Sequence, residues 1–256
     1  VNAMTGAVSI THTGSADVEI DNGTTALNLG TVTVGQNFEA RSGGVISDSG
    51  VITVAGTATF ITDVNDIDIV LNGDNAITGA LTFTTQTSGS TNGADITFDN
   101  GSTAISLAAF TTEGNLTLQT DAAIALTGHT VNGDLAVTSA GAISQSAALT
   151  VSGTSSFTST GSNNNITLST DSNALTGAVS ASTVGSSGDV TIDNGTTALN
   201  LGTVTANGAL SVRGGNGITD SGVITVSGTS LFHSDVTAKV ITLDSVNAMT
   251  GAVSIT

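Results

Sequence analysis

The stretch IDNGTTALNLGTVT at residues 20–33 returns without a change at residues 192–205. A looser copy, FDNGSTAISLAAFT, lies between them at residues 98–111. The segment VNAMTGAVSIT also occurs twice, at residues 1–11 and at residues 246–256. Such internal repetition is the sequence signature of an elongated array in which one structural unit stacks on the next. We therefore expect a repeat array that is a segment of a longer repeat protein.

Four segments with the pattern Asn-Ala-x-Thr-Gly-Ala divide this array into units. They begin at Asn2, Asn75, Asn173 and Asn247. The predicted organisation is one β-solenoid array over residues 1–256, with internal units at 2–74, 75–172 and 173–246 and the next unit beginning at 247.

Apolar residues within the units recur with a period of two. Val18 and Ile20 alternate with Asp17, Glu19 and Asp21, as expected for a strand with one buried face. The composition agrees, because Pro, Cys, Trp and Tyr are absent and Gly, Thr, Ser, Asn and Asp are abundant. No window sustains a helical stripe of apolar residues. The pattern predicts an all-β parallel β-solenoid with essentially no helix and three short strands per coil.

A recurrent Gly-x-Leu opening predicts about ten coils. Three of these coils would be distinctly longer than the others and carry the DNG stretches, and each of the three could instead be two short turns, which would give thirteen. In this alignment Phe60, Phe157 and Phe232 are expected to fill one interior position in different layers. A second set, Ile69, Ile166 and Ile241, is expected to fill another.

The charge limits the possible partners. Three basic residues against twenty acidic ones give a formal net charge of -17 at pH 7. Such a chain repels nucleic acid and anionic membrane surfaces, so we expect neither nucleic-acid binding nor membrane insertion. No apolar run approaches the length of a membrane helix, and we expect any secretion signal to lie outside this segment. The absence of Cys removes disulfides and thiol chemistry.

The best-defined polar pattern is Asp-x-x-x-Asp-Asn-Gly. It occurs three times, at Asp17, Asp21, Asn22 and Gly23, at Asp95, Asp99, Asn100 and Gly101, and at Asp189, Asp193, Asn194 and Gly195. The two carboxylates of each copy lie roughly 13 Å apart along a strand, too far for one metal ion or for a paired-carboxylate hydrolase. We interpret each copy as a solvated strand edge that runs into an Asn-Gly turn with positive φ.

Other candidate chemistry is sparse. Asp63, Asp66 and Asp68 form the densest acidic cluster, which could hold a weak surface Ca²⁺ but is interpreted as a solvated loop. The basic residues are Arg41, Arg213 and Lys239. The two arginines occupy the same repeat position several coils apart, and each is interpreted as a lone exposed side chain. His12, His129 and His233 occupy unrelated repeat positions and give no catalytic triad or zinc spacing. The sequence therefore predicts no catalytic, cofactor-binding or metal residues, and no enzyme.

Two consecutive coils carry a family resemblance. GNLTLQTDAAIALTGHTVN at 114–132 and GDLAVTSAGAISQSAALTVS at 133–152 resemble the shaft repeats of filamentous-haemagglutinin-type bacterial surface proteins. The resemblance extends more loosely to GTSSFTSTGSNNNITLST at 153–170 and GALSVRGGNGITDSGVITVSG at 208–228. It implies a right-handed parallel β-helix that is secreted and displayed as an adhesin or matrix fibre. The secretion-domain motifs of that class, which carry Asn-Pro pairs, are absent, so the chain corresponds to shaft rather than tip.

These observations lead to one expected function and one alternative. The chain is expected to be a structural, non-enzymatic shaft of an extracellular bacterial fibre or surface adhesin. Its partners would be neighbouring coils, or subunits of the same protein joined end to end. The alternative is a carbohydrate-binding adhesin module that presents one solenoid face to cell-surface glycans. The absence of Tyr and Trp favours the structural interpretation.

Overall fold

The computed structural model describes residues 2–86, 93–170, 172–236 and 238–256. In these ranges the chain forms a parallel β-solenoid of about 12 turns without a helix. No helix able to cross a membrane is therefore found in the described part of the chain. The prediction of an all-β parallel solenoid is confirmed, although the turns outnumber the ten predicted coils. The chain separates into two compact units, Val1–Ala122 and Ala123–Thr256.

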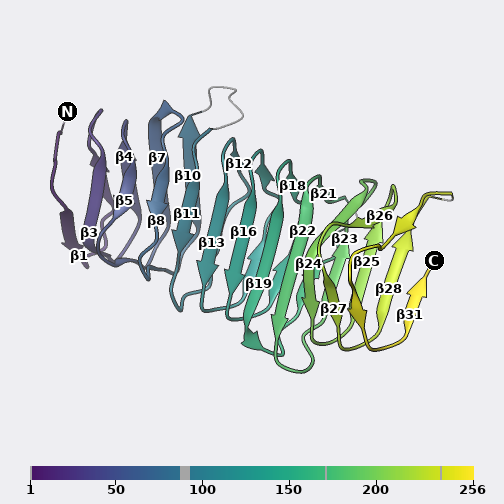
Figure 1. The fold of residues 1–256 in the computed structure, drawn as a ribbon. Helices are drawn as coiled ribbons and strands as arrows, with labels where there is room; N and C mark the ends of the chain where they lie inside the picture. The colour runs from purple at the N-terminus through teal and green to yellow at the C-terminus, as the bar shows by residue number, and fades with distance from the viewer. Residues whose placement is uncertain (1, 87–92, 171, 237) are drawn as a thin grey trace. The chain divides into compact units, whose positions relative to one another are not determined.

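Three strand ladders form the walls of the first unit (Figure 1). The first ladder contains β2 (Val18–Asp21), β4 (Phe38–Ser42), β7 (Ala58–Asn65) and β10 (Leu81–Gln86). The second contains β3 (Leu27–Val34), β5 (Ile46–Asp48), β8 (Ile69–Leu71), β11 (Ile96–Asp99) and β13 (Leu116–Thr120). The end of β3 also belongs to a third ladder, with β1 (Val8–His12), β6 (Ile52–Val54) and β9 (Ala76–Ile77). The unit also contains β12 (Thr111–Thr112).

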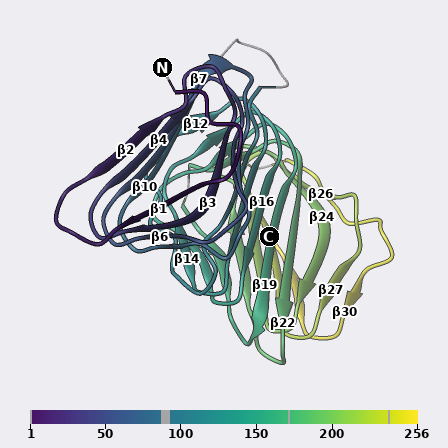
Figure 2. The same cartoon turned by 90° about the vertical axis from the view of Figure 1, so that its left-hand side faces the viewer.

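The register of these ladders sets the length of a turn. Val18, Phe38, Ala58 and Leu81 are successive parallel partners, so the chain advances by a similar step from each turn to the next. In Figure 2 the turns of this unit, drawn in purple and blue, lie one behind another. The stretch that repeats at residues 20–33 therefore belongs to a turn of ordinary length. The single long coil predicted around this stretch is wrong, because β1 pairs with β3 and not with β4, and the alternative of shorter turns describes it better.

The second unit has the same construction. One ladder contains β14 (Ile124–Leu126), β17 (Ile143–Gln145), β20 (Ile166–Leu168), β23 (Val190–Asp193), β25 (Leu210–Gly214), β28 (Ser230–Ser234) and β31 (Val253–Ile255). Another contains β16 (Leu135–Ser139), β19 (Ser155–Ser162), β22 (Ala178–Val184), β24 (Leu199–Ala206), β26 (Ile218–Asp220) and β29 (Ile241–Thr242). The remaining strands are β15 (Thr130–Val131), β18 (Thr150–Val151), β21 (Ala174–Leu175), β27 (Ile224–Val226) and β30 (Ala248–Met249).

The core of each unit follows from the period of two. In β3 the side chains of Leu27, Leu29, Val32 and Val34 are buried, whereas Thr31 between them is exposed. The exact copy in β24 has the same burial pattern. Each buried aliphatic side chain contributes about 1.5–3 kcal/mol, but a single turn has no second layer against which to bury it. Stacking of turns is therefore what completes the core.

Aromatic side chains form a column inside the first unit. Phe60 lies between Phe38 and Phe83, with ring centroids 6.0 and 5.8 Å away. Phe83 also contacts Phe98 and Phe110, at 5.6 and 6.0 Å. Phe38, Phe60 and Phe98 are fully buried. This column was not predicted, because the alignment of repeats compared equivalent residues and not residues of neighbouring turns.

The prediction that equivalent Phe residues share one interior position is wrong. Within the second unit Phe157 lies on β19, in the ladder of β22 and β24, whereas Phe232 lies on β28, in the ladder of β25 and β31. Ile166 and Ile241 are exchanged between the same two ladders. The physical reason is the repeat length. Three turns from β19 lead to β26, and Phe232 lies a further part of a turn along the chain. One sequence repeat thus contains a non-integral number of turns.

Candidate functional site

The densest group of charged side chains in the second unit surrounds Arg213. Asp193 is the last residue of β23 and is the register partner of Arg213 on β25. Arg213 in turn is the register partner of His233 on β28, and Asp235 follows that strand. Because parallel neighbours place equivalent side chains on the same face, three successive turns bring these groups together. The steps along the chain from Asp193 to Arg213 and from Arg213 to Asp235 each correspond to about one turn.

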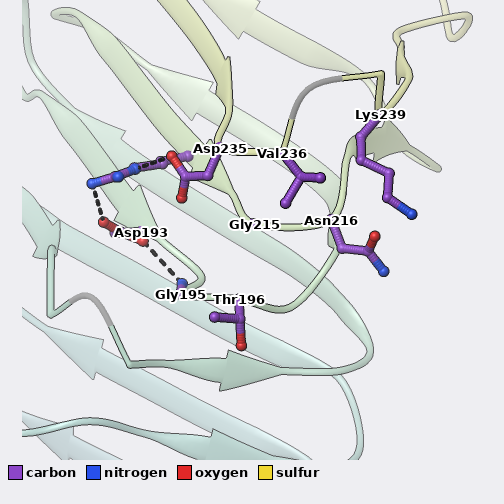
Figure 3. A pocket seen from close by; sticks show the side chains of 9 residues that line it. Asp193, Gly195, Thr196, Gly215, Asn216, Asp235, Val236 and Lys239 are labelled. Carbon is purple, nitrogen blue, oxygen red and sulfur yellow. Dashed lines mark hydrogen bonds and ion pairs between the residues drawn. The ribbon is translucent and has the colours of Figure 1, made fainter.

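Arg213 joins the carboxylates of Asp193 and Asp235, which belong to the turns on either side. Figure 3 shows these two aspartates. Its Nη1 lies 3.4 Å from Asp193 Oδ2, and its Nε donates to Asp235 Oδ1. His233 Nε2 lies 3.1 Å from the same Asp235 oxygen. Asp193 is buried, and its Oδ1 accepts a hydrogen bond of 2.9 Å from the backbone N–H of Gly195. Both carboxylates are therefore already engaged by protein groups.

A groove of about 390 Å³ lies beside this charged group. Gly195, Gly215 and Val236 line it together with Asn216 and Lys239. A side chain at Gly215 would collide with the carbonyl oxygen of Gly195, since a Cβ there would lie 2.3 Å away. The groove can accommodate a small polar group, but among the described residues no set of three His, Cys, Asp or Glu side chains is arranged to hold a metal ion.

The first unit carries a related arrangement on the equivalent stretch of the repeat. Asp21 on β2 is the register partner of Arg41 on β4, and Arg41 Nη1 lies 2.7 Å from Asp63 Oδ1. Arg41 Nη2 also lies 3.5 Å from Glu39. Although partial burial opposes it, the attraction of Asp63 and then of Glu39 raises the pKa of Arg41. The interpretation of Arg41 and Arg213 as isolated arginines is therefore wrong.

The third DNG copy has an amide in place of the guanidinium. Asp99 at the end of β11 is the register partner of Gln119 on β13, and Gln119 Nε2 donates to Asp99 Oδ2 at 2.8 Å. Asp99 is buried, and this burial raises the pKa of its carboxyl group. A neutral donor stabilises the ionised carboxylate less than an arginine would.

The asparagine of each DNG turn lies inside the protein. Asn22, Asn100 and Asn194 are at most 1% exposed, so the prediction of a solvated edge is wrong for them. The predicted turn geometry is confirmed, because the glycines that follow have φ of 58°, 50° and 56°. Each glycine N–H donates to the preceding Asp, at 2.7, 2.8 and 2.9 Å. The hydrogen bond to the aspartate thus fixes the turn, and in this turn the asparagine side chain points inward.

Each buried asparagine bonds the Asn-Ala-x-Thr-Gly-Ala segment of the preceding turn. Asn22 Oδ1 accepts from the N–H of Met4, Asn100 Oδ1 from that of Ile77, and Asn194 Oδ1 from that of Leu175. The first asparagine of an Asn-Ala-x-Thr-Gly-Ala segment acts in the same way when the segment itself follows another turn. Asn75 accepts from the N–H of Ile52 and Asn173 from that of Leu149. The sequence analysis did not predict these contacts. The recurrence of the DNG turn together with the Asn-Ala-x-Thr-Gly-Ala segment could have indicated them.

Several aspartates join neighbouring turns through the backbone. Asp17, Asp95 and Asp189, the first acids of the Asp-x-x-x-Asp-Asn-Gly pattern, accept from the N–H groups of Asn37, Asn115 and Ala209 at 3.2, 2.7 and 2.7 Å. Asp220 accepts from Asn247 and from the N–H groups of Asp244 and Ser245. Burial opposes the ionised form of Asp220, but these hydrogen bonds outweigh it and lower its pKa.

The remaining candidates do not form a common site. Asp63 pairs with Arg41, whereas Asp68 Oδ1 accepts from the N–H of Asp95 in the next turn at 2.9 Å. Asp66 adopts a left-handed conformation with φ of 59°. His129 is buried, and burial lowers its pKa to about 4. Its Nε2 lies 3.5 Å from Thr127 Oγ1, and His233 Nδ1 lies 2.8 Å from Thr256 Oγ1.

Comparison with known families places these features in a repeat family. The family model described as "Repeats of unknown function (DUF5649)" matches residues 15–84, 113–182 and 187–256, which is most of the chain. The chain belongs to the DUF5649 repeat family. No curated protein and no solved structure matches it.

Each DUF5649 match contains one Asn-Ala-x-Thr-Gly-Ala segment at the same place. Asn75, Asn173 and Asn247 occupy the same position counted from the first residue of their respective matches. The Arg41 and Arg213 groups lie in the first and third matches, and the turn with Asp99 lies between the first two. The DUF5649 repeat thus carries the segment that the buried asparagines bond. It carries no match to a named surface protein, so the likeness to filamentous-haemagglutinin-type shafts stays a prediction.

Proposed function

We propose that this chain is the structural shaft of an extracellular bacterial fibre or surface adhesin, and that it has no catalytic activity. The observation that carries the proposal is the repeated bonding between neighbouring turns inside each unit. Backbone ladders, buried asparagines and the aspartate bonds all join one turn to the next. Such frequent hydrogen bonding between neighbouring turns is suited to a rigid structural protein. With a rise of about 4.8 Å per turn, length grows in proportion to the number of repeats.

The charged groups support this role better than a catalytic one. The Asp193 and Asp235 carboxylates are paired with Arg213, and Asp193 also accepts from Gly195. A general acid or base needs a titratable group that is free to exchange a proton with the substrate. We infer that these ion pairs stabilise neighbouring turns, and that the net charge of -17 keeps separate rods apart in solution. Partners would be further turns of the same protein, covalent or joined end to end.

Immunogold labelling of cells from the native source tests the location and the fibre role together. Antibodies against the folded chain are expected to label extended material outside intact, unpermeabilised cells. Cells without the gene serve as the control. Labelling that appears only after permeabilisation would contradict an extracellular shaft.

The groove beside Arg213 favours one second candidate, a carbohydrate-binding module. Its volume of about 390 Å³ is suited to a single sugar, and Asn216 and Lys239 supply polar groups. Against this, none of the described residues that line the groove is an aromatic residue on which a sugar ring could stack. A glycan array with the wild type and Lys239→Ala distinguishes the two. Binding that depends on Lys239 would support the carbohydrate-binding module, and the absence of binding would favour the structural shaft.

A further inference from the structure

The sequence uses the dipeptide Asn-Gly again and again, and this dipeptide is chemically labile. Its described copies begin at Asn22, Asn72, Asn100, Asn132, Asn194, Asn207 and Asn216. In such a pair the backbone nitrogen of Gly attacks the Asn Cγ, because no side chain on Gly obstructs the approach. A new N–C bond closes a succinimide ring, the C–N bond of the amide breaks, and ammonia leaves with the proton of the backbone nitrogen. Water then opens the ring to aspartate or isoaspartate.

The three buried copies are held in a state that cannot react. The Asn194 amide accepts from the Leu175 N–H at 2.8 Å and donates to the carbonyl groups of Leu175 and Ala198 at 3.0 and 2.8 Å. The attacking nitrogen is also engaged, since the Gly195 N–H donates to Asp193. Ring closure would require the amide to rotate out of all these bonds. Asn22 and Asn100 are held in the same way.

Asn216 is in the opposite situation. It is exposed between the buried residues Gly215 and Gly217, in the turn that joins β25 to β26. Its side chain makes no hydrogen bond to any of the residues that the structure describes. Figure 3 shows its amide extending into the groove on the side where Lys239 lies. The amide is therefore free to rotate toward the Gly217 nitrogen, and water reaches the product.

The remaining copies, Asn72, Asn132 and Asn207, differ in their contacts. The Gly73 N–H that follows Asn72 donates to Asp48 at 3.3 and 3.2 Å, and the Asn207 side chain donates to the carbonyl of Thr183. Asn132 is exposed and makes no such bond within the described residues. The contacts thus divide the Asn-Gly pairs into held and free ones.

We propose that Asn216 is a site of spontaneous deamidation in the folded protein, with Asn132 as a second, and that the buried asparagines of the DNG turns are protected. The modification adds a carboxylate to the groove beside Lys239. The proposal is independent of the fibre role. It also explains how a labile dipeptide can recur at three buried positions without limiting the lifetime of the fold.

Peptide mapping of the full chain tests this proposal. The three basic residues direct trypsin to release residues 1–41 and 214–239. Asn216 is the one asparagine of the second peptide, and Asn22 is the one Asn-Gly asparagine of the first. The folded protein is incubated at mildly alkaline pH, then unfolded and digested with trypsin, and the masses of the peptides are measured. The mass gain from replacement of an amide by an acid is expected in 214–239 at a rate at least about tenfold above that in 1–41.

Two controls make the outcome decisive. In denaturant both peptides should gain mass at similar rates, because both contain an unhindered Asn-Gly pair. The variant Asn216→Gln should show no fast gain in 214–239, since a glutamine ring closes slowly. The proposal is overturned if 214–239 stays unmodified in the folded protein while it reacts in denaturant. It is equally overturned if 1–41 reacts as fast as 214–239 in the folded protein.

Discussion

The side chain of Asn194 and the backbone of Leu175 exchange two hydrogen bonds. The Leu175 N–H donates to Asn194 Oδ1 at 2.8 Å, and Asn194 Nδ2 donates to the Leu175 carbonyl oxygen at 3.0 Å. An amide side chain here replaces a backbone peptide group of the next turn. The same exchange joins Asn100 to Ile77 and Asn22 to Met4. Asn194 lies in the turn that follows β23, whereas Leu175 ends β21, so the side-chain amide continues the bonds between turns where the backbone leaves its strand.

Removal of this amide should be costly. Asn194→Ala leaves the buried N–H and C=O of Leu175 without their partner and also removes the part-buried bond to the carbonyl of Ala198. We expect the free energy of unfolding to fall by about 2–4 kcal/mol, because each unsatisfied buried group costs about 1–3 kcal/mol. Urea unfolding followed by circular dichroism measures the change.

A matched asparagine provides the control for that experiment. Asn216→Ala removes an exposed amide in the same unit, and it should change the stability by less than about 0.5 kcal/mol. Equal losses in Asn194→Ala and Asn216→Ala would show that the buried exchange with Leu175 contributes nothing.

The Phe column should stabilise the first unit through packing. Phe60→Ala would open a cavity between Phe38 and Phe83 and is expected to lower stability by about 3–5 kcal/mol. Phe60→Leu retains most of the apolar volume, so its loss should be roughly half as large. Thermal unfolding compares the two variants. A loss below about 1 kcal/mol for Phe60→Ala would be incompatible with the packing described.

The ion pairs around Arg213 should contribute little to the free energy of unfolding. The side chain of Arg213 is 50% exposed, so water screens its attraction to Asp235. A double-mutant cycle with Arg213→Met and Asp235→Asn is expected to give a coupling of about 0.5–1 kcal/mol that decreases with added salt. A coupling that does not respond to salt would mean that the pair is shielded from solvent.

His129 should make the fold sensitive to acid. Burial lowers its pKa to about 4, below its ordinary value of 6.5, so the unfolded chain binds the proton more readily. Its contribution is fully present above pH 6.5 and is lost as the pH falls through 4, a decrease of about 3 kcal/mol. His129→Leu should remove that part of the pH dependence. If the wild type and His129→Leu lose stability in parallel between pH 7 and 4, the histidine is not held in its neutral form.

Much of the fold could be predicted from local patterns. The alternation of Val18 and Ile20 with acidic residues indicated a strand, and the Asn-Gly pairs indicated positive φ at Gly23, Gly101 and Gly195. Both depend on neighbouring residues only, which is why a sequence alone reveals them. The turn length was harder, since it requires the pairing of strands that lie a full turn apart along the chain.

The errors all arose from contacts between turns. Phe157 and Phe232 match in the sequence repeat but lie on different ladders, because a repeat is not a whole number of turns. Arg41 and Arg213 looked isolated in the sequence, yet the winding of the chain brings Arg41 to Asp63 of the next turn and places Arg213 between Asp193 and Asp235. The burial of Asn194 was missed for the same reason. The spacing from Asp193 to Arg213 would have revealed the site once the turn length was known.

Cryo-electron microscopy of material from the native source tests the central claim most directly. A structural shaft predicts a continuous filament longer than this segment, with stacked turns and a layer line near about 4.8 Å, the spacing of neighbouring strands. Such a map would also show whether covalent repeats or separate subunits make up the length. A compact particle with an ordered sugar or metal in the groove beside Arg213 would contradict the shaft and would favour a binding protein or an enzyme.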